Sequence, residues 1–218
     1  MAPIRRVINA QWVTDFLQYI LDGDQQFTIL IICASRESFL EQLVANMQYQ
    51  TTESVGHHQL LTKTLGLLSK SRNVRTVFCP TLEHLRAYLT TAVDGRVPVS
   101  QKNGRLTALL AILNPLGLHL STREFSAQGL SRTLANAVEV STRTNTSIVL
   151  CECRDAQDPT NVELGEALWY VDVPLLSNSL RAGPEGNYWT GRAVPVRRVV
   201  QRWFQFANLS RRDHIMTS

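Results

Sequence analysis

The residues that could bind a nucleotide stand in the wrong setting for that chemistry. Lys63-Thr64 and Lys70-Ser71 pair a lysine with a hydroxyl, but no glycines precede them that would let backbone N–H groups wrap a phosphate. No G-x-G-x-x-G motif occurs either. The apolar run that should end in a magnesium-binding carboxylate ends in Asn114, whose amide is a weaker ligand for a hard cation. We therefore expect no nucleotide cofactor and no ATP hydrolysis by this chain alone.

A few other polar residues could form a small-molecule site. Asn114 and His119 follow one apolar run, and Glu152 lies near the end of another. The carboxyl ends of strands line the ligand crevice of an open α/β sheet. With Arg123, these residues could build such a site. A capped loop with satisfied polar groups, and Glu152 facing solvent, is the interpretation we favour, because His119 has no acid–base partner beside it. The pair His57-His58 lacks the spacing of metal ligands.

The four cysteines, Cys33, Cys79, Cys151 and Cys153, each lie in or at the end of an apolar run. Reduced core cysteines occupy such positions and pack as small hydrophobic residues. Cys151-Glu-Cys153 is not a C-x-x-C redox or zinc spacing, and we expect its two thiols on opposite faces of a strand. Free thiols indicate a reducing compartment, the nucleus or the cytoplasm.

The C-terminal part of the chain is basic. The formal net charge is +4, and seven arginines lie between residue 181 and the end, against the two acids Glu185 and Asp213. Such a segment is a candidate phosphate-binding surface for nucleic acid. A solvated surface that contacts an acidic partner is the alternative. The candidate DNA contacts are Arg192, Arg197, Arg198, Arg202, Arg211 and Arg212.

Aromatic residues accompany these arginines. Trp169, Tyr170, Trp189 and Trp203 are candidates for a partner interface, because Tyr, Trp and Arg are enriched at protein–protein contacts. Arginines interleaved with aromatic rings are also typical of surfaces that bind single-stranded nucleic acid. Packing in the core is a third interpretation, above all for Trp203.

Continuous apolar runs predict the secondary structure that would position these residues. Runs of this length suit strands that are buried on both faces of a parallel sheet. A helical pattern from about 125 to 144 supplies the crossover between the last two runs. The sequence thus predicts an α/β fold with strands at 27–34, 74–79, 107–113 and 147–153.

Further helices are predicted at 9–22, 35–47, 57–71 and 81–93. In the second of these, Phe39, Leu40, Leu43, Val44 and Met47 are expected to face inward. In the third, Leu60, Leu61, Leu65 and Leu68 share one face. Residues 94–104 read as a loop, 168–176 as a strand and 177–191 as a hairpin-type connection, whereas 192–206 fits either strand or helix. We expect an N-terminal helix in 1–26, one domain over 27–206 and a basic tail over 207–218.

This order of elements resembles the RecA-like ATPase core. The resemblance rests on the strand at 27–33 with its Ser35-capped helix, on the Walker-B-like strand at 106–113, and on the helix and strand that follow. It implies a mostly parallel sheet flanked by helices, with a C-terminal antiparallel extension. Because the phosphate loop is missing and Asn114 replaces the Walker B acid, the chain is similar to degenerate members of that group. These are the small Rad51 paralogs, such as Shu-complex subunits, and the RecA-like accessory subunits of Elongator.

The resemblance implies a non-catalytic subunit of a heteromeric complex. We expect a nuclear protein (or a cytoplasmic one) that assists homologous recombination and DNA repair through DNA and through a RecA-like or SWIM-type partner subunit. A structural role in an Elongator-like tRNA-modification assembly is the second hypothesis. A small-molecule enzyme that uses Asn114, His119 and Glu152 is the third. No apolar run approaches the roughly 20 residues of a membrane helix, so no membrane contact is expected.

Overall fold

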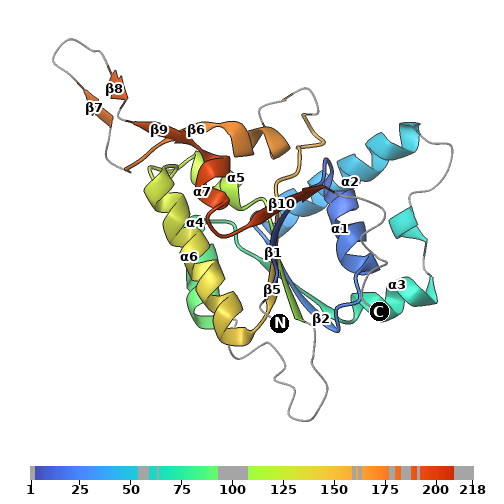
Figure 1. Ribbon diagram of the computed structural model, residues 1–218. Coiled ribbons are helices and arrows are strands. Elements are labelled where there is room, and N and C mark those ends of the chain that lie inside the picture. The colour runs from blue at the N-terminus through green and yellow to red at the C-terminus, as the bar shows by residue number, and fades with distance from the viewer. Residues whose placement is uncertain are drawn as a thin grey trace.

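A six-stranded parallel sheet forms the centre of the protein (Figure 1). The computed structural model describes residues 3–53, 59–62, 64–92, 108–158, 161, 164–176, 180–182, 188–190 and 192–208. The strand order is β10-β1-β5-β4-β2-β3, and every pairing is parallel. The strands are β1 (Arg5–Asn9), β2 (Phe27–Ile32), β3 (Val74–Phe78), β4 (Ala108–Leu113), β5 (Ser147–Cys151) and β10 (Gln205–Asn208). The four strands predicted from apolar runs are therefore confirmed.

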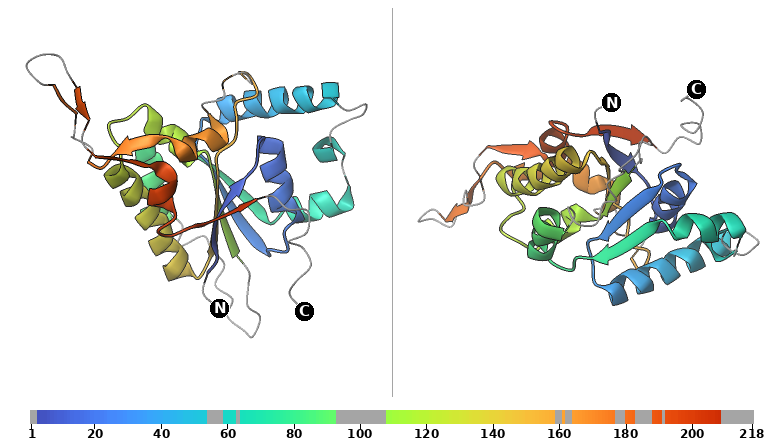
Figure 2. Two further views of the ribbon diagram at one scale, coloured as in Figure 1. Left: turned by 45° about the horizontal axis from the view of Figure 1, so that its top comes forward. Right: turned by 90° about the horizontal axis from the view of Figure 1, so that it is seen from below.

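Helices cover both faces of this sheet (Figure 2). One face carries α1 (Val13–Asp22), α2 (Arg36–Glu53), the short 3-10 helix η1 (Gln59–Leu61) and α3 (Leu65–Ser71). The other carries α4 (Leu82–Ala87) with its π-helical continuation η2 (Tyr88–Ala92), α6 (Ala127–Thr144) and α7 (Val196–Val200), while α5 (Pro115–Leu120) follows β4 directly. The buried apolar side chains fall into two clusters, one on each face. The predicted RecA-like α/β layout is confirmed.

The central crossover follows local rules that the sequence carries. All six residues of β4 are buried, as expected for a strand covered on both faces. Ser126 caps α6 by accepting a hydrogen bond from the Gly129 N–H. Asn145 ends the helix in the left-handed conformation, with φ of 51°. The predicted helix at 125–144 is confirmed to within two residues.

The N-terminus differs from the prediction. A helix over 9–22, as part of an N-terminal unit 1–26, is wrong at its start because Arg5–Asn9 forms β1, between β10 and β5. Val7 is fully buried and pairs with both Leu150 and Phe206. The strand has only five residues, and two of them are adjacent arginines. An analysis of hydrophobic periodicity needs a longer window, so it did not detect this strand. The α/β domain therefore includes β1 and does not begin at residue 27.

The C-terminal segment combines both interpretations of 192–206. It contains β9 (Ala193–Pro195), then α7, then β10. The strand expected over 168–176 is instead a 3-10 helix, η3 (Gly165–Tyr170), followed by β6 (Asp172–Pro174). β6 pairs antiparallel with β9, and β7 (Leu180–Ala182) pairs antiparallel with β8 (Tyr188–Thr190). The antiparallel extension is confirmed, but β10 leaves it and joins the main sheet beside β1 (red beside blue in Figure 2).

The inward face predicted for α2 is right only in part, because Phe39 is buried whereas Leu40 and Val44 are exposed. Leu61, Leu65 and Leu68 of η1 and α3, which were predicted to share a face, are also exposed. The expected loop at 94–104 and the residues from 209 onward lie outside the described residues. Within the described ranges, none of the helices has the length and apolar content that crossing a bilayer requires.

Removing residues 1–26 tests the place of β1 in the domain. We expect this deletion to abolish cooperative thermal unfolding, because the sheet would lose a strand that is paired on both sides and the buried Phe16 of α1. Circular dichroism during heating measures it. The control Ile4→Ser, at a half-exposed position, should change stability by no more than about 0.5 kcal/mol. A deletion variant that melts cooperatively with native helix content would contradict the assignment.

Candidate functional site

At one position on the carboxyl edge of the open α/β sheet, between β1 and β5, the chain itself closes the crevice in which a ligand could bind. β1 continues into α1 on one face, whereas its neighbour β5 continues toward η3 and α7 on the other, so a switch point lies between them. There the Arg154 N–H donates to the Gln11 carbonyl at 3.0 Å. Asn9 of β1 also donates to Glu166 of η3 at 3.0 Å. These contacts join the loops on both sides of the position that a ligand would occupy.

The N-terminus of α1, the helix after β1, carries an acid, although the N-terminus of a helix generally favours an anionic ligand. The Trp12 N–H donates to the Asp15 carboxylate at 3.2 Å, so Asp15 caps the helix. Gln50 of α2 donates to the same carboxylate at 3.4 Å and accepts a hydrogen bond from Thr14 at 2.9 Å. A negative side chain at this position repels phosphate. Trp is not a usual N-cap residue, so the sequence carried no capping signal at the start of this helix.

Glu152 is buried, with 2 % of its surface exposed. The expectation that it faces solvent was therefore wrong. Its Oε1 accepts a hydrogen bond of 2.5 Å from the Leu116 N–H, and the Gly117 N–H also binds the carboxyl group. Burial raises the pKa of Glu152 from 4.5 to about 8, although the two amides act in the opposite direction. A pKa raised this far favours the protonated form at neutral pH, and a protonated carboxyl group is a poor metal ligand.

Asn114 is bound to the backbone at the end of β4. It has a φ of 56°, in the left-handed region, and its side-chain oxygen accepts a hydrogen bond from the Cys153 N–H at 2.8 Å. Its own N–H donates to the Cys151 carbonyl at 2.7 Å. Asn tolerates this conformation better than most residues. The residue in the Walker B position therefore ties β4 to β5 and has a structural explanation.

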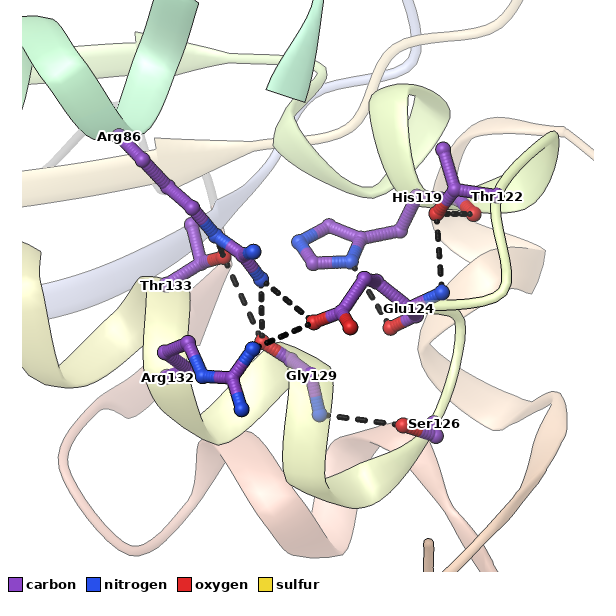
Figure 3. A network of polar contacts seen from close by, with 8 residues as sticks. All are labelled: Arg86, His119, Thr122, Glu124, Ser126, Gly129, Arg132 and Thr133. Carbon is purple, nitrogen blue, oxygen red and sulfur yellow. Dashed lines mark hydrogen bonds and ion pairs between the residues drawn. The ribbon is translucent and has the colours of Figure 1, made fainter. Parts of the chain in front are cut away.

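His119 belongs to a polar network that connects α4 with the start of α6 (Figure 3). Its Nδ1 lies 3.1 Å from the Glu124 carbonyl, and only 1 % of the residue is exposed. Burial lowers the pKa of His119 to about 4, and the nearby positive charge of Arg86 lowers it further. The imidazole is neutral at physiological pH, so Nδ1–H donates to that carbonyl. Asn114, His119 and Glu152 are thus each engaged with main-chain groups.

Arg86 is the centre of the same network, and no local pattern in the sequence indicates this role. Its guanidinium contacts the Glu124 carboxylate at 3.0 Å, the Thr133 hydroxyl at 3.0 Å and the Gly129 carbonyl at 3.1 Å. Arg132 joins the same carboxylate at 3.2 Å. The partners lie 38 to 47 residues away from Arg86 in sequence, beyond the reach of helical spacing rules. This network holds α4 against α6.

All four cysteines are free and buried, as predicted. The expectation that Cys151 and Cys153 point to opposite faces was wrong, because residues two apart on a strand share a face. Their sulfur atoms lie 3.5 Å apart. Burial is the main cause that raises the pKa of the Cys153 thiol. Among the described residues, no group of three or more His, Cys, Asp or Glu side chains could hold a metal ion.

The predicted DNA-binding arginines divide into two classes. Arg197 is occupied inside the protein: it donates to the Tyr170 hydroxyl at 2.5 Å and stacks over the ring of Phe206 at 4.6 Å. Arg192, Arg198 and Arg202 are exposed, and they form no ion pair with the residues that the structure describes. Arg211 and Arg212 lie outside the described residues. The exposed arginines surround α7 and form what we call the α7 basic surface: Arg192, Arg198 and Arg202.

The predicted aromatic interface also divides. Trp169 is 1 % exposed and packs edge-on against Phe206 with ring centroids 5.5 Å apart, so it is a core residue and offers no surface to a partner. Tyr170 is exposed beside Arg197. Trp203 is half-buried, with the guanidinium of Arg202 5.5 Å above its ring. The side chain of Trp189 lies outside the described part of the chain. The accessible aromatic residues are therefore next to the α7 basic surface.

A protein-family model described as SPAC22G7.03-like matches residues 6–214. The match begins inside β1, which agrees with the place of that strand in the domain. The description names no activity, ligand or partner. A search of curated proteins found no match to this chain.

Glu152→Gln tests the buried carboxyl group through the pH dependence of stability. The folded protein keeps the Glu152 proton up to a pKa of about 8, whereas the unfolded chain releases it near 4.5. Between these values the unfolded state binds fewer protons, so this group makes stability fall as pH rises, by at most about 1.4 kcal/mol per pH unit. We expect the free energy of unfolding of the wild type, minus that of Glu152→Gln, to decrease from pH 5 to pH 8.

Denaturant titrations at a series of pH values measure this difference. Glu139→Gln, at an exposed position on α6, is the control and should keep the wild-type dependence. Parallel curves for the wild type and Glu152→Gln would contradict the raised pKa.

Proposed function

We propose that this chain, which belongs to the SPAC22G7.03-like family, is a non-catalytic RecA-like subunit of a heteromeric complex that assists homologous recombination and DNA repair in the nucleus. One observation carries the proposal. The polar groups at the ligand crevice bind one another, whereas the arginines of the α7 basic surface are exposed and unpaired among the described residues. The exposed arginines are thus available to a polyanion, whereas the crevice between β1 and β5 is not available to a nucleotide.

Two features support a non-catalytic role. Asp15 occupies the N-terminus of α1, and Gln11 and Arg154 close the crevice between β1 and β5 beside it. The protonated Glu152 and the bonded Asn114 replace the carboxylates that would hold magnesium. A chain of this kind contributes binding surfaces to an assembly, and a partner subunit supplies any nucleotide chemistry.

The shape of the α7 basic surface supports contact with the nucleic-acid backbone. Arg198 lies in α7, and Arg202 lies in the turn that directly follows the helix. Trp203, half-buried next to Arg202, offers an aromatic edge beside these charges. Arginine binds phosphates in a bidentate manner, so two or three such residues give an affinity that depends steeply on salt.

The double variant Arg198→Ala/Arg202→Ala tests the contact with DNA. In anisotropy titrations with labelled duplex DNA, we expect the slope of log affinity against log salt to become shallower by roughly 0.9 for each lost phosphate contact. Arg197 stays unchanged in this design because its loss would disturb the stack with Tyr170 and Phe206. The titrations use the protein together with the partner subunits that co-purify with it.

The matched control is Arg36→Ala/Arg75→Ala, which removes two exposed arginines from α2 and from β3 at the opposite edge of the sheet. It should leave the slope unchanged. If the wild type and the α7 variant had the same slope of log affinity against log salt, the proposed contact of this surface with DNA would be wrong. The Elongator-like alternative would be favoured if the wild type bound tRNA more tightly than duplex DNA and the α7 variant lost this tRNA binding.

A further inference from the structure

An exposed leucine surface lies beside a cavity on the face opposite the α7 basic surface. Leu65 of α3 is 87 % exposed, and Leu61 and Leu68 are 53 % and 49 % exposed. Single exposed leucines are common, but three within eight residues form a patch that needs a covering partner. Leu65 and Leu68 are three residues apart on α3, so they share one face of the helix.

The cavity next to this patch has a volume of about 430 Å³ and lies between α1 and α3. Leu21 from α1 and Leu67 from α3 are its apolar lining residues, and Gly66 also lines it. The remaining lining residues are polar or charged: Gln18, Asp22, Thr62, Thr64 and Lys70. A side chain added at Gly66 would meet nothing within 4 Å, so the space in front of this residue is open. The cavity is large enough to receive one or more apolar side chains of a partner.

Charges at the groove indicate which partner fits. Asp22 on the α1 wall already accepts a hydrogen bond from Gln18 at 2.7 Å. Lys70 lines the cavity and Arg72 follows α3, both exposed, and neither forms an ion pair with a residue in the described ranges. The hydrogen bond from the neutral Gln18 amide does not cancel the charge of Asp22, so Lys70 and Arg72 against Asp22 leave one net positive charge at the groove, which complements an acidic partner.

From these three observations we infer that the groove between α1 and α3 binds an acidic amphipathic helix of a partner protein. One apolar side chain of that helix enters the cavity, its other apolar residues cover Leu61, Leu65 and Leu68, and its carboxylates face Lys70 and Arg72. This is helix-in-groove recognition, in which apolar anchors at helical spacing supply most of the contact. The inference deepens the proposed role as a binding subunit, on which it rests.

A second copy of the chain fits this surface less well. A stable interface buries about 800 Å² on each partner, far more than three partly exposed leucines supply. Two copies facing each other would also bring Lys70 and Arg72 close to their own equivalents if α3 packs on α3. An inserted helix instead adds the cavity walls to the buried area and neutralises both cations.

A synthetic peptide provides the test. The probe is a fluorescein-labelled helical peptide with leucines at positions i, i+3, i+4 and i+7 and glutamates on its remaining faces, and its twin carries lysines in place of glutamates. We expect the full-length protein to bind the glutamate peptide at least about tenfold more tightly than the lysine peptide. Lys70→Glu/Arg72→Glu should reverse that preference.

Two variants with matched controls locate the site. Gly66→Leu fills the space before the cavity and, as a better helix former, should not unfold α3. Leu65→Ser/Leu68→Ser removes the apolar cover. Each should weaken binding of the glutamate peptide at least about tenfold. Gly117→Leu, at a helical glycine on α5 with equally open space, and Leu120→Ser, at an exposed leucine, should bind like the wild type.

Three results would overturn the inference. They are equal binding of the two peptides, unchanged binding after Gly66→Leu, and self-association in sedimentation equilibrium that is lost in Leu65→Ser/Leu68→Ser. DNA titrations on the same preparations separate the two proposals. If a groove variant loses peptide binding but keeps the wild-type salt dependence of DNA binding, the α7 basic surface acts independently of the groove. If the α7 variant loses DNA binding but still binds the peptide, the groove acts independently of the α7 basic surface.

Discussion

The pairing of β1 with both β10 and β5 is the constraint on which the rest of the fold depends. Because Val7 lies opposite Leu150 and Phe206, the N-terminal strand holds the C-terminal strand in the sheet. This pairing places the short connection to α1 next to the loop after β5, where Gln11 meets Arg154. It also brings Phe206 under Arg197 and next to Trp169. The closed crevice and the orientation of α7 both follow from one buried five-residue strand.

Burial controls the chemistry of the polar residues at the carboxyl ends of the strands. A carboxyl group that accepts two backbone hydrogen bonds would normally have a low pKa, yet desolvation outweighs them for Glu152. His119 is held neutral for the same reason. Groups that are neutral and bonded to the main chain stabilise the turn into α5 and do not need a ligand. The residues that look most reactive in the sequence thus have structural roles.

Particular residues explain which features sequence reasoning could reach. The six buried residues of β4 and the caps Ser126 and Asn145 carry strong local signals, so the α/β order was predictable. β1 was missed because its short segment contains two arginines and lacks a longer pattern. Leu65 and Leu68 of α3 were predicted only to share a face, because periodicity does not say which face meets the core, and both are exposed. The contacts of Arg86 are long-range and only the fold reveals them.

The two proposed binding surfaces lie on opposite sides of the sheet. Arg197 stacks on Phe206, so α7 lies beside β10 at one edge, whereas α3 leads directly into β3 at the other edge. A nucleic acid on Arg198 and Arg202 therefore does not compete for space with a helix between α1 and α3. Since the sheet and both core clusters separate them, occupancy of one surface need not change the other. A subunit built in this way can link a partner protein to a polyanion without a nucleotide-driven conformational change.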